Sequence, residues 1–525
     1  MVTLTNTDAI RRDPRRWWAL GALVASMLVL GFDMTILNVA LPTMARDLGA
    51  STGEQQWMAD AYVVVFAALM LPAGLLGDRF GRRRMLITGL GIFLVGSAVG
   101  ALVDDVNLVI AARAVMGIGG ALVMPLAMAV LPSLFEPDEQ TKAVGAVSAA
   151  SALGLPLGPI LGGWLLDHFW WGSIFLLNVP MAAIGIIACI FLLPETCDPA
   201  SPKVDAVSTA YTTAGLSVLI YALIEAPHRG WGDPLILALF AVSAILIALL
   251  VVRERRSVRP MLDLSLLAQR GFLLNTLAAT LVLFVLSGLM FVLPQYLQAV
   301  LGYDAFATGV RMLPMMGGLL IAARGAQPLL ARFGARAVIS AGLVALSFAA
   351  ILGSRTSVGD SYGFTALWLS IAGLGFGFAV VPAMTAALGA LPRDRAGSGS
   401  ALLMTVRQVG SAIGIALLGS LLASAYVDKL DTSGLPGAAA DTAADSVVGA
   451  KIVAAQLGDR ALAASADTAY VHGMSLVLLV SGVAALVTAL LAAALLPKPK
   501  AAEATGSTAP GQDTDVAPSV ADAGQ

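Results

Sequence analysis

The stretch Ala146–Gly163 reads AVSAASALGLPLGPILGG and contains no charged residue. Every fourth position from Ala146 to Gly162 is alanine or glycine. Residues four apart lie on one face of an α-helix, so this helix would carry a groove without side chains, into which another backbone can pack closely. Pro159 removes one backbone donor and is expected to bend the helix. The spacing alone fits both a static packing seam and a moving interface between membrane helices.

The composition of the 525-residue chain is that of an integral membrane protein. Hydrophobic residues make up 58% and charged residues 12%, with a mean hydropathy of +0.86, whereas soluble domains have about 25% charged residues. The net charge of −2 and the absence of a basic domain argue against a nucleic-acid partner. Cys189 and Cys197 are too few for a disulfide framework.

A helix needs roughly 20 apolar residues to cross a bilayer, and uncharged runs of about that length recur along the chain. They predict an all-α membrane protein with fourteen transmembrane helices. We expect these spans at about 17–40, 56–76, 85–103, 108–131, 143–166, 174–193, 206–225, 235–252, 271–294, 306–330, 337–354, 362–384, 398–424 and 473–496. Arginine and lysine gather in alternate loops, so the positive-inside rule places both termini in the cytoplasm.

Three segments are expected to lie outside the membrane. Residues 1–16 form a cytoplasmic N-terminal segment, and residues 425–472 form an external loop with a helical piece near 445–465. Residues 499–525 contain too little apolar surface to fold and are expected to be a disordered cytoplasmic tail.

The second part of the chain repeats the first at an offset of 252 to 256 residues. The matching pairs are Leu41-Pro42 with Leu293-Pro294, Asp78–Arg83 with Ala331–Arg336, and Gly154-x-x-x-Gly158 with Gly410-x-x-x-Gly414. The repeat predicts two six-helix halves, 17–193 and 271–496, with two inserted helices at 206–252. Parallel halves of this kind are a transporter architecture, in which the substrate site lies between the halves.

Among the charged residues within predicted spans, four are candidates for a functional role. Asp33 is deep in the first span, where a carboxylate is costly and therefore a functional candidate by default. Burial disfavours its charged form, so it could bind and release protons, although a structural hydrogen-bonding role is the alternative.

Asp60, near Trp57, could be an accessory acid or a solvated cap. Arg113 needs an acidic partner or water, and Arg407 could be a side chain that snorkels to the membrane surface.

The segment Gly74–Arg84, GLLGDRFGRRR, is predicted to be a short basic turn between the second and third spans. Gly81 permits a tight turn, and Arg79 and Arg82 would be ordinary cytoplasmic anchors. Anchoring does not explain Asp78. We expect its carboxylate to dock on the start of a helix in the other half, closing the cytoplasmic side.

No sequence feature supports enzymatic chemistry, so an enzyme is not expected. No lysine follows a glycine, which excludes a phosphate-binding loop. His168, His228 and His472 are scattered without metal-ligand spacing, so neither a metal nor an organic cofactor is expected.

Several motifs together resemble the major facilitator superfamily, and within it the fourteen-span drug:proton antiporters. They are the turn Gly74–Arg84, the span-four motif Arg113-x-x-x-Gly117-x-Gly119 with Met116 at a position often occupied by glutamine, the antiporter motif Gly154–Gly163, the span-one segment Asp33–Pro42 and the segment Trp170–Pro180. The second half departs from the first, because Ala331 replaces the acid of the turn and Ile415 replaces the hinge proline.

The resemblance covers about residues 15–497 and implies a monomeric, multi-pass exporter of the bacterial inner membrane. It would expel amphipathic drugs, antibiotics or related small molecules in exchange for protons, with the lipid bilayer as its surroundings and the proton gradient as its only energy source. Proton-coupled import of a small organic solute, and export of a dedicated natural product or lipid, are the alternatives.

The resemblance also assigns three groups of candidate site residues. They are Asp33, Asp60 and Arg113 for proton coupling or substrate binding, Gly74, Asp78, Arg79, Gly81 and Arg82 for the conformational gate, and Gly154, Gly158, Pro159, Gly162 and Gly163 for the antiporter hinge. Whether Asp33 or Asp60 is the main coupling acid stays open at this point. For the hinge, we expect Gly158→Leu to abolish transport and Gly163→Ala to be milder.

Overall fold

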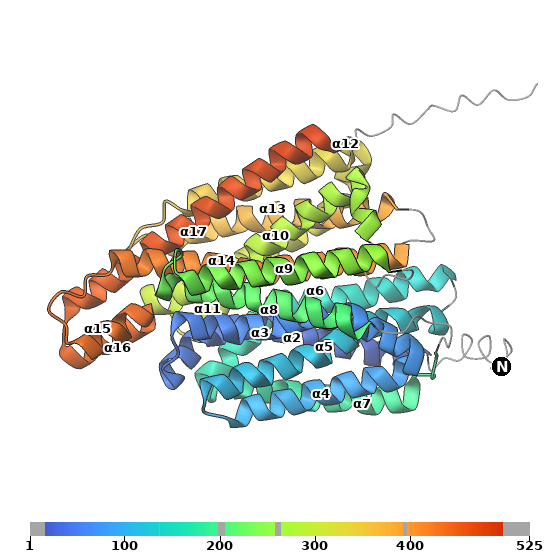
Figure 1. The fold of residues 1–525 in the computed structure, drawn as a ribbon, viewed down its shortest axis with the longest axis horizontal. Helices are drawn as coiled ribbons and strands as arrows, with labels where there is room; N and C mark the ends of the chain where they lie inside the picture. The colour runs from blue at the N-terminus through green and yellow to red at the C-terminus, as the bar shows by residue number, and fades with distance from the viewer. Residues whose placement is uncertain (1–15, 136, 198–204, 258–263, 392–395, 497–525) are drawn as a thin grey trace, which may run out of the picture.

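The computed structural model describes residues 16–135, 137–197, 205–257, 264–391 and 396–496. These residues form helices and short connections, and no strand occurs among them (Figure 1). The predicted all-α class is thereby confirmed. The expected tail 499–525 and most of the N-terminal segment 1–16 lie outside the described residues.

The helices follow one another with few residues between them. In chain order they are α2 (Arg16–Leu48), α3 (Thr52–Phe80), α4 (Arg82–Leu102), α5 (Val106–Leu134), α6 (Pro137–His168), α7 (Ser173–Leu192), α8 (Ala206–Arg229), α9 (Pro234–Arg256), the 3-10 helix η1 (Leu264–Ala268), α10 (Arg270–Gln295), the π-helix η2 (Tyr296–Val300), α11 (Ala305–Arg311), α12 (Leu313–Gly353), α13 (Tyr362–Gly389), α14 (Ala396–Lys429), α15 (Gly437–Asp445), α16 (Val447–Leu457) and α17 (Arg460–Leu495). Aspartates cap the first turns of α5, α8, α9, α11 and α17.

Twelve of the described helical segments are long and apolar enough to cross a bilayer. The two parts of α3, Thr52–Met70 and Pro72–Phe80, are bent by 54° and make a thirteenth if they count as one span. The helix α6 runs for 32 residues beside α2. The total of fourteen spans therefore stays a prediction, while the membrane-spanning character of the chain is clear.

The spanning helices pack as two groups. Helices α2 to α7 contact one another and form the first group. Helices α10, α12, α13, α14 and α17 form the second, together with α11, which leads directly into α12, and the two groups lie side by side in Figure 1. The inserted helices α8 and α9 pack together, and α8 contacts both α3 and α14. Ser243 of α9 donates to the carbonyl oxygen of Gly215 of α8 at 2.8 Å. The exact domain boundaries expected from the sequence stay a prediction.

The predicted repeat is visible in the backbone of the two short turns. Gly81 separates α3 from α4 with φ of 106°, and Gly334 interrupts α12 with φ of 77°. Both angles lie in the region that favours glycine. Each turn is a single residue rather than the longer basic turn expected, because the helices on both sides continue up to the glycine.

The segment after α14 closes one end of the bundle. Helices α15 and α16 lie beyond the ends of the spanning helices, at the left of Figure 1, and we name this the capped end; α2 begins and α17 ends at the opposite, termini end. Tyr426 donates to the carbonyl oxygen of Ala443 at 3.0 Å, and Thr52 donates to that of Asp445 at 2.7 Å. The expected helical piece near 445–465 corresponds to α16. The non-spanning segment is shorter than the predicted 425–472, because α14 extends to Lys429 and α17 starts at Arg460.

Candidate functional site

A buried ion pair lies inside the first group of helices. Arg113 of α5 donates from Nη1 to Oδ2 of Asp33 of α2 at 2.6 Å, and their side chains are only 2% and 1% exposed. Asn178 of α7 donates to the other carboxylate oxygen, Oδ1, at 3.1 Å. The acidic partner that Arg113 was expected to need is therefore Asp33. Both carboxylate oxygens of Asp33 accept a hydrogen bond, which offsets part of the cost of burying the charge.

The guanidinium of Arg113 is also fixed by α3. Its Nε donates to the carbonyl oxygen of Met58 at 3.1 Å, and its Cζ lies 4.6 Å from the centre of the Tyr62 ring. A cation over an aromatic face is a favourable contact. The pair Asp33–Arg113 of α2 and α5 is therefore also held by α3 and α7, so a change in the charge of Asp33 affects contacts among four helices.

Asp60 lies apart from this pair. Its side chain is fully buried, and neither carboxylate oxygen has a hydrogen-bond partner in the described part of the chain. The solvated cap considered from the sequence is therefore wrong. A buried carboxyl group without partners is costly in its charged form, so Asp60 stays a candidate acid.

A cavity of about 280 Å³ lies between the two groups of helices. Its walls include Met27 and Met34 of α2, Phe66 and Met70 of α3, and Phe376 of α13. Methionine and aromatic side chains adapt to differently shaped apolar ligands. A smaller cavity of about 100 Å³ shares Met34 with it and has Arg113 in its lining. The ion pair and the apolar cavity therefore adjoin.

The large cavity also contains Arg407 of α14, together with its neighbour Gln408. The side chain of Arg407 faces the space between the helix groups, so the expectation that it snorkels along the membrane surface is wrong. Its only described hydrogen bond runs from Nη1 to the sulfur of Met404 at 3.4 Å. The sequence could not predict this direction, because α14 carries apolar and small residues on several faces.

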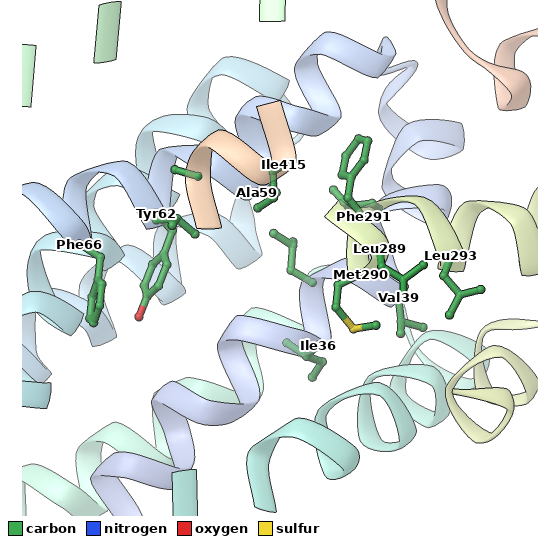
Figure 2. Close-up of a cluster of buried hydrophobic side chains, with 14 of the residues drawn as sticks. Ile36, Val39, Ala59, Tyr62, Phe66, Leu289, Met290, Phe291, Leu293 and Ile415 are labelled. Carbon is green, nitrogen blue, oxygen red and sulfur yellow. The ribbon is translucent and has the colours of Figure 1, made fainter. Parts of the chain in front are cut away.

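Buried apolar side chains fill the interior between this cavity and the capped end. Figure 2 shows Ile36 of α2, Ala59 of α3, Met290 of α10 and Ile415 of α14 converging from both helix groups. Gln298 of η2 donates to the carbonyl oxygen of Val39 at 2.8 Å, which adds a polar contact between the groups. These side chains and the Gln298 contact join the two helix groups on the capped-end side of the cavity.

The glycine groove of α6 contacts two partners. A Cβ on Gly154 would lie 2.5 Å from the carbonyl carbon of Gly31, and one on Gly158 would lie 2.0 Å from Oγ1 of Thr35, so these positions pack against α2. A Cβ on Gly163 would lie 2.4 Å from the carbonyl oxygen of Ala305, which belongs to the other helix group.

Two further hinge positions extend these contacts. Gly162 packs against Ile36 of α2. Pro159 approaches the other group, since a Cβ on Gly309 would lie 2.2 Å from the Pro159 carbonyl oxygen. The groove therefore serves both as a packing seam within one group and as a contact between groups. A Cβ on Gly163 would meet backbone, so Gly163→Ala is expected to have an effect, and the expectation that it is milder than Gly158→Leu stays a prediction.

An acidic side chain reinforces the same contact. Asp167, near the end of α6, accepts from the backbone N–H groups of Ala305 and Phe306 at 3.2 and 3.1 Å. These groups begin α11, where a carboxylate also interacts favourably with the helix dipole. Between Asp167 and α16 lies a cavity of about 660 Å³ whose lining includes Arg46 and Lys451.

At the termini end, Asp78 pairs within its own helix group. Arg82 donates from Nε to Asp78 at 2.9 Å and from Nη1 to the carbonyl oxygen of Ala129 at 2.8 Å. Gly74 packs against α5, where a Cβ would lie 3.9 Å from Pro125. Arg79 lies over the neighbouring Phe80 ring, 5.6 Å from its centre. In this conformation no described contact joins Asp78 to the other group.

Comparison with known proteins agrees with this architecture. Residues 23–415 match the Major Facilitator Superfamily. The chain is 31% identical over 504 residues to the tetracenomycin C resistance and export protein of Streptomyces glaucescens, covering 93% of each chain. It is 33% identical over 459 residues to the multidrug efflux pump LfrA of Mycolicibacterium smegmatis, covering 86% of this chain and 90% of that protein.

Among solved structures, an inward-facing bacterial homologue of the human lysosomal transporter Spinster superposes with a TM-score of 0.67 at 19% identity, covering 92% of this chain and 98% of that one. This likeness concerns the fold alone. Together with the family match and the two relatives, it leads to one assignment: the chain is a membrane transporter that belongs to the major facilitator superfamily.

Proposed function

We propose that this transporter is a proton-coupled exporter of amphipathic small molecules, such as antibiotics, across the bacterial inner membrane. The observation that carries the proposal is the buried pair Asp33–Arg113 beside an apolar cavity between the two helix groups. A titratable acid next to a substrate-sized space lets proton binding and substrate binding influence each other. The names of the resistance and export relatives support the direction of transport.

The proposal assigns the capped end to the outside. Arginines concentrate in the connections at the termini end, which the positive-inside rule places in the cytoplasm. In that orientation, the contacts of Asp167 and Gly163 with α11 close the external side, and the transporter faces the cytoplasm. Alternating access would require these contacts to break while Asp78 forms a new one at the opposite end.

Asp33 is proposed as the coupling acid. In its charged form it neutralises Arg113, and the first helix group is held together around the pair. A proton arriving at Asp33 would leave the Arg113 charge buried without a counter-ion, which favours a rearrangement of α2 and α5. Loss of the proton to the cytoplasm would restore the pair and return the protein to the conformation described here. Asp60 is the second candidate for this role.

Import by symport is the remaining alternative in the same fold. The complete glycine motif of α6 and the export relatives favour antiport. We also propose the fourteen-span arrangement, with α6 as one span and α3 as another, and a monomer as the working unit.

The proposal is tested with purified protein in proteoliposomes. An imposed proton gradient should drive a fluorescent amphipathic dye against its own gradient, and an uncoupler should abolish that movement. Dye movement that is indifferent to the gradient would exclude proton coupling, and movement in the same direction as the protons would establish symport.

A further inference from the structure

Three of the residues that line the central cavity each have one buried polar atom without a hydrogen-bond partner among the residues that the structure describes. Nε of Arg407, Nε2 of Gln408 and the hydroxyl group of Tyr62 are all buried, and none has a hydrogen-bond partner within the described ranges. All three residues line the 280 Å³ cavity. Buried polar groups are normally satisfied, so three unsatisfied groups around one space indicate that a ligand supplies the missing acceptors.

The charge in the lining of the cavity is positive. Arg407 cannot lose its proton at physiological pH, and its lining partners include no acidic residue. No described salt bridge involves Arg407. Arg113, which lines the adjoining smaller cavity, is already neutralised by Asp33 at 2.6 Å. An isolated cation in an apolar space is costly, and an anionic ligand would remove that cost.

The rest of the lining fits a flat aromatic body. Tyr62 and Phe66 stack with ring centres 5.7 Å apart, and Met27, Met70 and Phe376 surround the same space. The volume of about 280 Å³ lies just below the range of about 300–1,000 Å³ that is usual for small-molecule sites. Fused aromatic rings with one acidic oxygen would match both the size and the donors.

We propose that the central cavity selects amphipathic anions, specifically flat aromatic molecules whose carboxylate or phenolate binds Arg407, with Gln408 and Tyr62 as further donors. The inference rests on the proposed export function, because it takes this cavity as the substrate site. It makes Arg407 the residue that determines the charge preference, separately from the proton-coupling acid Asp33.

The test measures binding of two dyes to the purified full-length protein by fluorescence polarisation, without any gradient. Fluorescein is anionic and rhodamine 6G is cationic, and both carry a xanthene ring system. We expect fluorescein to bind more tightly, and Arg407→Gln to weaken its binding by about tenfold or more, since a charge-assisted hydrogen bond is lost. Arg407→Lys should keep most of the affinity. The exposed Arg355, changed to Gln, is the matched control and should have no effect.

Competition on the unaltered protein covers the case in which Arg407→Gln does not fold. Fluorescein should displace bound rhodamine 6G at a lower concentration than its methyl ether methyl ester, a neutral compound in which neither the phenol nor the carboxyl group can ionise. Equal displacement by the acid and the ester, or an equal loss of both dyes in Arg407→Gln, would overturn the inference.

The two proposals fail in different ways. Binding of fluorescein that depends on Arg407, without uphill movement in proteoliposomes, would refute proton-coupled export and leave the charge preference standing. Uphill export of rhodamine 6G that is unaffected by Arg407→Gln would keep the exporter and refute the anion preference.

Discussion

Arg113 and Asp33 form a charge pair 2.6 Å apart that is almost completely buried, and the pair joins α5 to α2. Replacing Asp33 by the uncharged Asn, which has nearly the same shape, separates the hydrogen bond to Arg113 from the exchange of a proton. In Asp33→Asn, the amide oxygen can still accept from Arg113, but no proton can be exchanged. We expect the folded protein to persist while uphill export and substrate-induced proton release are lost.

The measurement is proton release from purified protein on addition of substrate, at several pH values. The double variant Asp33→Asn with Arg113→Gln is the control for the unpaired charge. Its thermal stability should exceed that of Asp33→Asn, since breaking one side of a buried pair typically costs about 3–5 kcal/mol. Continued proton release by Asp33→Asn would transfer the coupling role to Asp60.

A second prediction concerns the contact of α6 with α11. Gly163→Ala places a methyl group 2.4 Å from the carbonyl oxygen of Ala305, and backbone cannot move aside as a flexible side chain can. We expect the conformation in which the capped end is closed to become less stable, and substrate export to become slower. Gly91→Ala in α4 is the control, because a Cβ there meets nothing within 4 Å. Equal transport rates for both variants would show that α6 does not need its close approach to α11.

A third prediction concerns Asp167, which caps the start of α11 from the other helix group. Asp167→Asn should weaken the closed capped end by about 0.5–1.5 kcal/mol, because the amide keeps one acceptor oxygen and one of the two hydrogen bonds is lost. Asp304→Asn is the control, because Asp304 caps the same helix from within its own group, at 2.6 Å from the N–H of Ala307.

The readout is the distance between spin labels at Asp47 and Ser357, two exposed positions near the capped end, in a background without Cys189 and Cys197. Asp167→Asn should increase the population with a long distance between the labels, and Asp304→Asn should not. An unchanged distribution in Asp167→Asn would mean that apolar packing alone holds this end closed.

A fourth prediction concerns the turn at Gly81. Asp78 pairs with Arg82 in the present conformation, and we expect it to move to the other helix group when the termini end closes. Asp78→Asn should therefore abolish export without reducing the amount of protein in the membrane. Glu195 contacts Arg84 at 3.5 Å beside the same turn, so Glu195→Gln is the matched control and should remain active. Full export by Asp78→Asn would remove the acid from the gating step.

Much of the fold follows from local sequence. The positions of the apolar runs match the helices closely. The turn that the sequence repeats in the two halves has a positive φ at Gly81 and at Gly334. The spanning character and the all-α class were predictable, because bilayer thickness and backbone hydrogen bonding leave few alternatives. The packing face of α6 was also readable, since small residues recur at every fourth position.

The direction of individual polar side chains was not predictable in the same way. A membrane helix is apolar on most faces, so periodicity does not reveal which side faces the cavity. Arg407 therefore reads as a surface residue in the sequence but lines the cavity in the structure. The same holds for Asp60, whose burial depends on neighbours from other helices, and for Gly163, whose partner Ala305 lies more than a hundred residues further along the chain.

The final prediction follows from the charge of the proposed substrate. If one anion leaves the cell as one proton enters, both movements carry positive charge inward, and each cycle transfers two charges. Each charge moving through 100 mV is worth about 2.3 kcal/mol, so a cycle gains about 4.6 kcal/mol from that potential. A cation leaving in exchange for one proton transfers no net charge and gains nothing from it.

In proteoliposomes at equal pH on both sides, a valinomycin potassium potential that makes the lumen positive should therefore drive fluorescein into the lumen. Rhodamine 6G should not respond, and Asp33→Asn should show only the passive leak that protein-free liposomes also show. Fluorescein uptake that requires a pH gradient and ignores the potential would mean that the cycle is electroneutral. The charge transferred per cycle thus depends on both Arg407, which would bind the anion, and Asp33, which would carry the proton. Measuring it tests the two proposed roles together.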